Sequence, residues 1–174
     1  LLSWSGGLTS KDTASLRLWD AQTTQSIGQP MRHIQGIVGA AFSKDQKRIL
    51  SWSRDGTLRL WDKETNQPVG QPMRHMQTVR GAAFSEDQTR ILSWSNDNTA
   101  RLWNAQTTQP IGQPMKHESI VDSAAFSSDQ ARILSWGYGT TVHLWNAKTA
   151  EAIGQPMQHE NDVVGAFFSP EQTH

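Results

Sequence analysis

The sequence contains no cysteine, so disulfide bridges, thiolate zinc sites and cysteine nucleophiles are all excluded. It also lacks an excess of charge of either sign, because 16 Lys and Arg residues balance 16 Asp and Glu residues. A domain with no basic excess does not have the electrostatic footprint of a general nucleic-acid binder. No apolar run approaches the roughly 18 residues that a membrane-spanning helix needs, and no signal-peptide pattern opens the chain. We therefore expect a cytoplasmic protein with neither a nucleic-acid nor a membrane partner.

Tyrosine is also scarce, with one Tyr against eight Trp, and most of the tryptophans are evenly spaced. Self-similarity at a fixed period is the signature of a repeat architecture. The interval is 42 residues, and it separates the members of four series: Trp19, Trp61, Trp103 and Trp145; Phe42, Phe84, Phe126 and Phe168; Met31, Met73, Met115 and Met157; and His33, His75, His117 and His159.

A second tryptophan series, Trp52, Trp94 and Trp136, keeps the same interval, whereas Trp4 lies 48 residues before Trp52. We interpret residues 6–11 as a six-residue insertion in one loop. The chain is then one domain or part-domain, residues 1–174. Its repeats occupy residues 21–62, 63–104 and 105–146, and a fourth is shared between residues 1–20 and 147–174.

Within one period, four short segments have the composition of β-strands and are separated by polar turns. A helical solenoid would need amphipathic runs of ten or so residues, and the sequence has none. Four antiparallel strands in about 42 residues are typical of a propeller blade. The strands expected in one period are residues 37–43 (IVGAAFS), 49–53 (ILSWS), 57–61 (TLRLW) and 68–73 (PVGQPM).

Residues 49–62, ILSWSRDGTLRLWD, resemble the signature of the WD-repeat β-propeller family. The resemblance covers essentially the whole chain in four copies, each with an upstream His and a terminal Trp-Asp or Trp-Asn. It implies an all-β fold with four blades of four antiparallel strands. The chain would begin on the second strand of a blade and end on a first strand, residues 163–169.

The resemblance also implies that a hydrogen-bonded tetrad of His, Ser, Asp and Trp pins each blade. Gly139 stands where the third tetrad should have its Asp, so we expect the weakest pinning there. The fourth tetrad would combine the two ends of the chain, with Asp12 as its displaced carboxylate. The tetrads are His33, Ser51, Asp55 and Trp61; His75, Ser93, Asp97 and Trp103; His117, Ser135 and Trp145; and His159, Ser3 and Trp19.

Strand alternation places Trp52, Trp94 and Trp136 on the face opposite the tetrad serines, so we expect these indoles to pack between neighbouring blades. Small residues recur on the expected inner strand, and we attribute them to packing where the inner strands converge on the axis. These residues are Gly39, Gly81, Ser123 and Gly165.

Positions that differ between the repeats are available for specificity, whereas those that recur build the blade. In the WD-repeat family, the partner-binding face is formed by loop positions near the repeat His and before the turn Asp. Arg and Tyr dominate interface hot spots, which favours a binding role for variable positions that carry them. The alternative, given equal weight, is that these positions differ only because duplicated repeats have diverged in sequence. Carried over to this sequence, the face consists of Arg54, Thr78, Arg80, Asn96, Asp122, Tyr138 and Asp162.

Two kinds of catalytic or metal chemistry are suggested by the residue types but disfavoured by their recurrence. Ser51, His33 and Asp55 resemble a hydrolase triad, yet the same set recurs in other blades, without an elbow motif. Four His at equal spacing lie on separate blades and diverge, whereas metal ligands must converge on one ion. We therefore expect no catalytic residue, no metal site and no cofactor.

The resemblance favours a non-catalytic scaffold that binds a protein or peptide on its loop face, since fold alone does not give function. Two alternatives stay open: a propeller that binds a small ligand or glycan, and a sensor segment of a larger signalling protein. For assembly, we expect two chains to close an eight-bladed ring as a homodimer, because an open ring exposes a strand edge. The competing arrangement is a longer parent chain with further blades.

Overall fold

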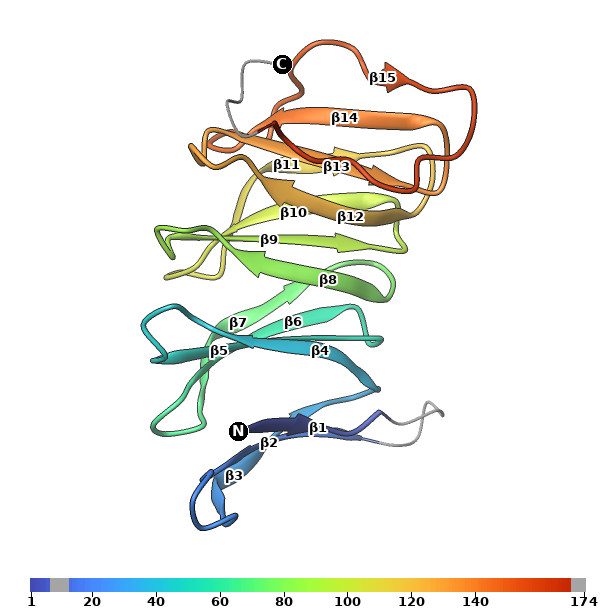
Figure 1. Ribbon diagram of the computed structural model, residues 1–174. Coiled ribbons are helices and arrows are strands. Elements are labelled where there is room, and N and C mark those ends of the chain that lie inside the picture. The colour runs from blue at the N-terminus through green and yellow to red at the C-terminus, as the bar shows by residue number, and fades with distance from the viewer. Residues whose placement is uncertain (7–12, 170–174) are drawn as a thin grey trace.

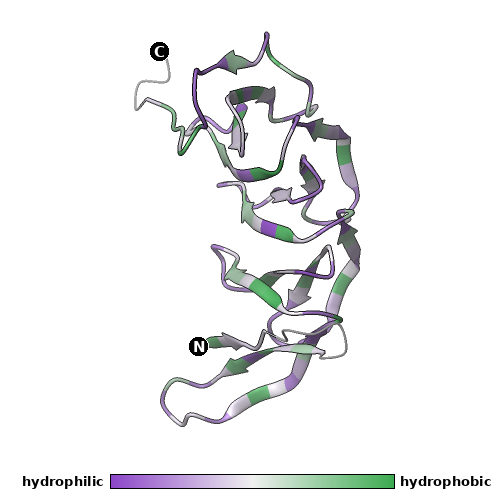
Figure 2. Ribbon diagram, turned by 90° about the vertical axis from the view of Figure 1, so that its right-hand side faces the viewer, coloured by the Kyte–Doolittle hydropathy of each residue, from purple (hydrophilic) through white to green (hydrophobic). Residues whose placement is uncertain are grey.

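The computed structural model describes residues 1–6 and 13–169, which form fifteen β-strands in four antiparallel sheets. The sheets follow one another in a curved row (Figures 1 and 2). No helix occurs among the described residues. The first sheet has three strands and the other three have four, each in chain order.

The strands of the first sheet are β1 (Leu2–Trp4), β2 (Ala14–Trp19) and β3 (Ser26–His33). The second contains β4 (Ile37–Phe42), β5 (Arg48–Ser53), β6 (Thr57–Asp62) and β7 (Pro68–Arg74). The third contains β8 (Val79–Phe84), β9 (Arg90–Ser95), β10 (Thr99–Asn104) and β11 (Pro110–Lys116). The fourth contains β12 (Val121–Phe126), β13 (Arg132–Gly137), β14 (Thr141–Asn146) and β15 (Met157–Gln158).

The sequence-based prediction of an all-β propeller-type fold is confirmed, and the strands expected between residues 37 and 73 agree with β4–β7 to within one residue at each end. The turns between them form because short polar side chains satisfy the reversing backbone. Between β4 and β5, Ser43 Oγ donates a hydrogen bond to the Asp45 carboxylate at 2.6 Å, and Gln46 adopts a left-handed φ of 56°.

The expectation of a first strand over residues 163–169 is wrong for the isolated chain. The segment has no strand structure, and Val164 and Phe167 are 99% and 89% exposed. The reason is geometric, because a first strand needs the second strand of its blade as its partner. That partner is β1, which lies at the other end of the row, so four sheets do not close a ring (Figures 1 and 2).

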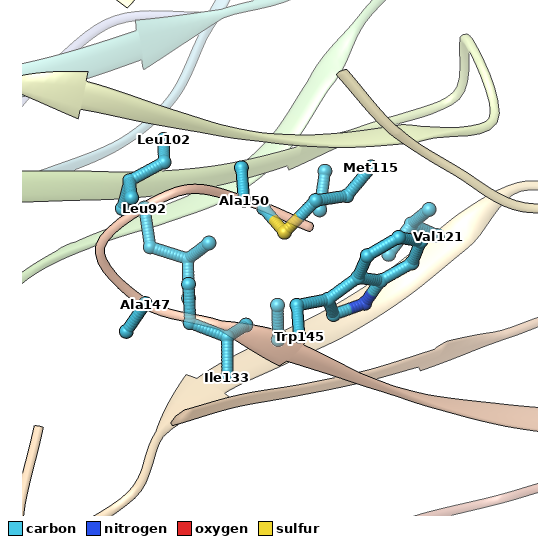
Figure 3. Close-up of a cluster of buried hydrophobic side chains, with 10 residues drawn as sticks. Leu92, Leu102, Met115, Val121, Ile133, Trp145, Ala147 and Ala150 are labelled. Atoms are coloured by element: carbon cyan, nitrogen blue, oxygen red, sulfur yellow. The ribbon is translucent and has the colours of Figure 1, made fainter. Parts of the chain in front are cut away.

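The core is divided among the interfaces between neighbouring sheets. Between the third and fourth sheets, Leu92, Leu102 and Met115 pack against Ile133 and Trp145 (Figure 3). Similar clusters lie between the first and second sheets and between the second and third. Burial of this apolar surface is the main term holding adjacent sheets together.

Two members of the second tryptophan series, Trp52 and Trp94, pack between neighbouring sheets as the alternation predicts. Trp52 lies against the cluster between the second and third sheets, and Trp94 against the cluster between the third and fourth. Each indole also covers a glycine on the neighbouring strand, because Gly39 pairs with Trp52 and Gly81 with Trp94. The small residues are therefore required by these indoles.

No helix among the described residues is long and apolar enough to cross a membrane.

Candidate interaction face

Two of the expected tetrads are assembled as continuous hydrogen-bonded chains. In the second sheet, the Trp61 indole donates to Ser51 Oγ at 2.9 Å, and that oxygen lies 2.7 Å from His33 Nε2. The third sheet repeats the arrangement with Trp103, Ser93 and His75 at 2.9 and 2.8 Å. Both serines are fully buried, which places their hydroxyls out of reach of a substrate.

The carboxylates of Asp55 and Asp97 complete these two tetrads, and each is held by a set of donors. Asp97 accepts hydrogen bonds from His75 Nδ1 at 3.0 Å, from the backbone N–H of Met76 at 2.8 Å and from the hydroxyl and N–H of Thr99 at 2.6 and 3.0 Å. Burial alone would raise the pKa of both Asp55 and Asp97. The hydrogen bonds from His and Thr outweigh burial and hold both pKa values well below the usual range.

The third tetrad lacks its carboxylate because residue 139 is Gly. Trp145 donates to Ser135 Oγ at 2.7 Å, and that oxygen lies 2.7 Å from His117 Nε2. His143 tilts against His117, with ring centroids 4.2 Å apart. Burial, with a smaller contribution from His143, lowers the pKa of His117 to about 3, so its imidazole is neutral at pH 7.

The fourth tetrad, expected from His159, Ser3 and Trp19, is only partly assembled within one chain. Trp19 donates to Ser3 Oγ at 2.7 Å in the first sheet. His159 is exposed and lies at the other end of the row, where its N–H donates to the Thr140 carbonyl. Asp12, the expected carboxylate, lies outside the described residues.

Four of the seven residues expected on the interaction face meet around one guanidinium group. Arg80, on β8, donates to the Asp122 carboxylate at 2.6 Å and is within 3.4 Å of the Tyr138 hydroxyl and of Asn96 Oδ1. The guanidinium carbon also lies 5.4 Å from the centroid of the Tyr138 ring. We name these four residues the Arg80 cluster. It links loops and strand ends of the third and fourth sheets.

The other three expected residues lie outside this cluster. Thr78 Oγ1 is 3.5 Å from the Arg54 carbonyl, which places these two residues at the boundary between the second and third sheets. The Arg54 side chain is exposed, as is that of Asp162, which follows β15 near the end of the row. The structure therefore joins four expected residues, sets two beside each other and leaves one apart.

A set of contacts between sheets, on the opposite edge from the Arg80 cluster, was not expected from the sequence. Arg48 donates to the Ala105 carbonyl at 2.8 Å and to the Gln88 carbonyl at 3.1 Å. Arg90 repeats this one period later, donating to the carbonyls of Ala147 and Gln130. The signal was present, because Arg48, Arg90 and Arg132 recur at the 42-residue interval. Among residues 1–6 and 13–169, no group of His, Asp and Glu is placed to hold a metal ion.

The family described as "WD domain, G-beta repeat" matches residues 26–62 and 66–104. Each match contains one complete tetrad. It spans the last strand of one sheet, β3 or β7, and the first three strands of the next, β4–β6 or β8–β10. Residues 26–104 therefore contain WD repeats, and the chain has a fold of the β-propeller type. WD repeats are in general protein-interaction scaffolds.

Solved structures show the same fold. The computationally designed Ika8 protein is 24% identical, with a TM-score of 0.75 over 97% of this chain. The computationally designed Ika4 protein is 25% identical, with a TM-score of 0.70 over 83% of this chain and 87% of its own. The chain spans 50% of the length of the Ika8 chain. No curated protein matches the sequence.

Proposed function

We propose that this chain is a non-catalytic scaffold that binds a protein or peptide on its loop face, with the Arg80 cluster at the centre of the contact. The observation that carries the proposal is the convergence of Arg80, Asp122 and Tyr138 from two sheets at a surface-accessible position. The exposed fractions of the Arg80 and Asp122 side chains are 32% and 42%, and Tyr138 is 54% exposed. Arg and Tyr are the residues over-represented at interface hot spots.

The internal contacts of the cluster support this role because they hold long side chains in place before a partner arrives. The Asp122 carboxylate and the Tyr138 ring together fix the Arg80 guanidinium. A side chain ordered in advance loses less conformational entropy on binding. The position of Arg80 is held by Val38, Asp122 and Val164 in the other repeats, so no other repeat has an Arg there.

A display experiment tests this function. A random peptide library is selected on the immobilised chain, and the Kd of each selected peptide is measured for wild type and for Arg80→Ala/Tyr138→Ala. We expect the double substitution to weaken binding by at least tenfold while the unfolding transition is retained. Glu64→Ala, an exposed change in the turn after β6, is the matched control. Equal binding by wild type and the double variant would remove the proposed face.

We also propose that two chains close one eight-bladed ring, and three incomplete contacts support this arrangement. The inner edge of β1 lacks the strand that β4 supplies to β5, and residues 163–168 carry the corresponding sequence. Trp4 is 44% exposed, while a Cβ on Gly165 would meet nothing within 4 Å. In a ring, Trp4 would cover Gly165 of the second copy as Trp52 covers Gly39. His159 of that copy would then reach Ser3 and Trp19.

Light scattering coupled to size exclusion tests the assembly. We expect a mass in solution of twice the 19.4 kDa of one chain. Gly165→Leu should return the protein to a monomer. The control is again Glu64→Ala, which should leave the mass at the dimer value. A mass of 19.4 kDa for the wild type would favour the longer parent chain instead.

A further inference from the structure

A small cavity lies beside the turn that joins β13 to β14. Its volume is about 140 Å³, and His117, Glu118, Tyr138, Gly139 and Thr141 are among the residues that line it. His117 is half-buried here, whereas the equivalent His33 and His75 are buried. The cavity therefore gives solvent access to an imidazole that the other two tetrads enclose.

In the second sheet, the equivalent position is filled by a carboxylate of the chain itself. Asp55 accepts hydrogen bonds from the Thr57 hydroxyl at 2.6 Å, from the Thr57 N–H at 2.9 Å and from the Ile34 N–H at 2.9 Å. His33 Nδ1 lies 3.4 Å from the same carboxylate. Asp97 has the same four donors in the third sheet. This position is thus a carboxylate site built from one imidazole, one hydroxyl and two backbone amides.

The fourth sheet keeps the residues that supply these donors and lacks only the acceptor. His117, the N–H of Glu118, and the hydroxyl and N–H of Thr141 occupy the equivalent positions, and Gly139 replaces the Asp. Among the described residues, no hydrogen bond is recorded for the Glu118 N–H or for His117 Nδ1. A Cβ on Gly139 would meet nothing within 4 Å.

The hydrogen-bonded chain is compatible with a proton on His117 Nδ1. The Trp145 N–H donates to Ser135 Oγ, whose hydroxyl is then free to donate to His117 Nε2. In that tautomer the neutral imidazole carries its proton on Nδ1 and can donate to a carboxylate. His143 Nε2 lies 3.3 Å from Thr141 Oγ1, as Arg101 Nε lies 3.3 Å from Thr99 Oγ1 in the third sheet. There, the Thr99 hydroxyl still donates to Asp97. The Thr141 hydroxyl has the same freedom in the tautomer in which His143 Nε2 is the donor of this contact.

We propose that this cavity binds the carboxylate group of a ligand in the position that the Asp55 carboxylate occupies in the second sheet. The group comes either from a small monocarboxylic acid or from an acidic side chain of a bound peptide. The acidic side chain of a bound peptide, as the source, rests on the proposed function, because Tyr138 lines the cavity and also belongs to the Arg80 cluster. The first source is independent of it. The side chain of Glu118 is exposed, so its negative charge is screened by solvent.

An acetate titration followed by ¹H–¹⁵N NMR tests the site without any peptide. We expect the amide signals of Glu118 and Thr141 to shift and saturate with sodium acetate, but not with sodium chloride at equal ionic strength. Thr141→Val removes one donor and should raise the Kd for acetate at least fivefold. Thr99→Val, the same change where Asp97 fills the position, should leave the Kd unaltered. Gly139→Asp supplies the chain's own carboxylate and should abolish the shifts.

Two results would overturn the site: no saturable acetate shift in the wild type, or an unchanged Kd in Thr141→Val. The second comparison does not depend on whether Gly139→Asp folds, which matters because Gly139 has a φ of 138°. The peptide source is tested separately with peptides selected for the interaction face, comparing Glu or Asp with Gln or Asn at each acidic position. Binding of acetate with no loss on Glu→Gln assigns the site to small acids. A loss confined to one acidic residue, absent in Gly139→Asp, assigns it to the partner.

Discussion

The indole of Trp52 covers Gly39, its cross-strand partner, so closely that a Cβ added to this glycine would lie 2.4 Å from Trp52 Cζ2. The ring also packs against the core between the second and third sheets, so it has little room to move away. The pair explains why a residue without a side chain stands in the middle of β4.

Gly39→Ala is therefore expected to destabilise the fold by about 1–3 kcal/mol, the usual cost of overpacking. Urea unfolding followed by tryptophan fluorescence measures the change. Gly6→Ala is the control, because a Cβ there meets nothing within 4 Å. Equal stability of the two variants would contradict the close packing of Trp52 on Gly39.

Trp61→Phe removes the donor to Ser51 Oγ from a fully buried tetrad. The loss should cost about 1–3 kcal/mol, because a buried acceptor is left without one of its partners. Trp94→Phe is the matched control, since no hydrogen bond is recorded for that indole among the described residues. Both variants lose ring volume, so the difference in their urea midpoints reports the hydrogen bond. Equal urea midpoints for Trp61→Phe and Trp94→Phe would show that the hydrogen bond to Ser51 does not contribute to stability.

Arg48→Lys should loosen the contact between the second and third sheets. The guanidinium reaches two carbonyls, those of Ala105 and Gln88, and an ammonium on a flexible stem does not reproduce this fork. We expect a loss of about 1–2 kcal/mol. Arg17→Lys, an exposed change on β2, should be neutral, and a similar loss there would show that the effect is not specific to the contact.

Mild acid should destabilise the protein through His117. Burial first, and the nearby His143 second, lower its pKa from 6.5 to about 3 in the folded chain, so the unfolded chain takes up a proton first. Stability is then lost as the pH falls below about 6.5, by about 1.4 kcal/mol per pH unit for this one group. Burial also lowers the pKa of His75, which acts in the same direction. His117→Gln should reduce the dependence of the urea midpoint on pH between pH 6 and pH 4. The same pH dependence in wild type and variant would contradict this assignment.

The repeated residues made most of the fold predictable. The residues equivalent to Trp61 and Ser51 recur at the 42-residue interval, and the strands that carry these two residues, β6 and β5, were expected to within one residue. Contacts that depend on ring closure were not predictable from the repeat alone. Residues 163–169 have the sequence of a strand, but a strand forms only where a partner edge is in reach.

The interaction face shows the same division. The positions of Arg80, Asp122 and Tyr138 followed from the repeat, whereas their mutual contact depends on how two sheets curve. The cavity beside Gly139 was indicated only as a missing tetrad carboxylate. Whether such a loss leaves space or is filled by collapse is decided by neighbouring side chains, here His117 and His143.

The three apolar clusters have a consequence for how the chain unfolds. Each cluster joins only adjacent sheets, so the cooperative unit is a pair of neighbours and not the whole molecule. The stability of such an array is the sum of the stability of each sheet and of each interface between neighbouring sheets. In a single chain the outer sheets have one neighbour each and the inner sheets have two. In the monomeric Gly165→Leu variant, amide hydrogen exchange should therefore proceed inward from both ends, with β5 and β9 the last strands to open.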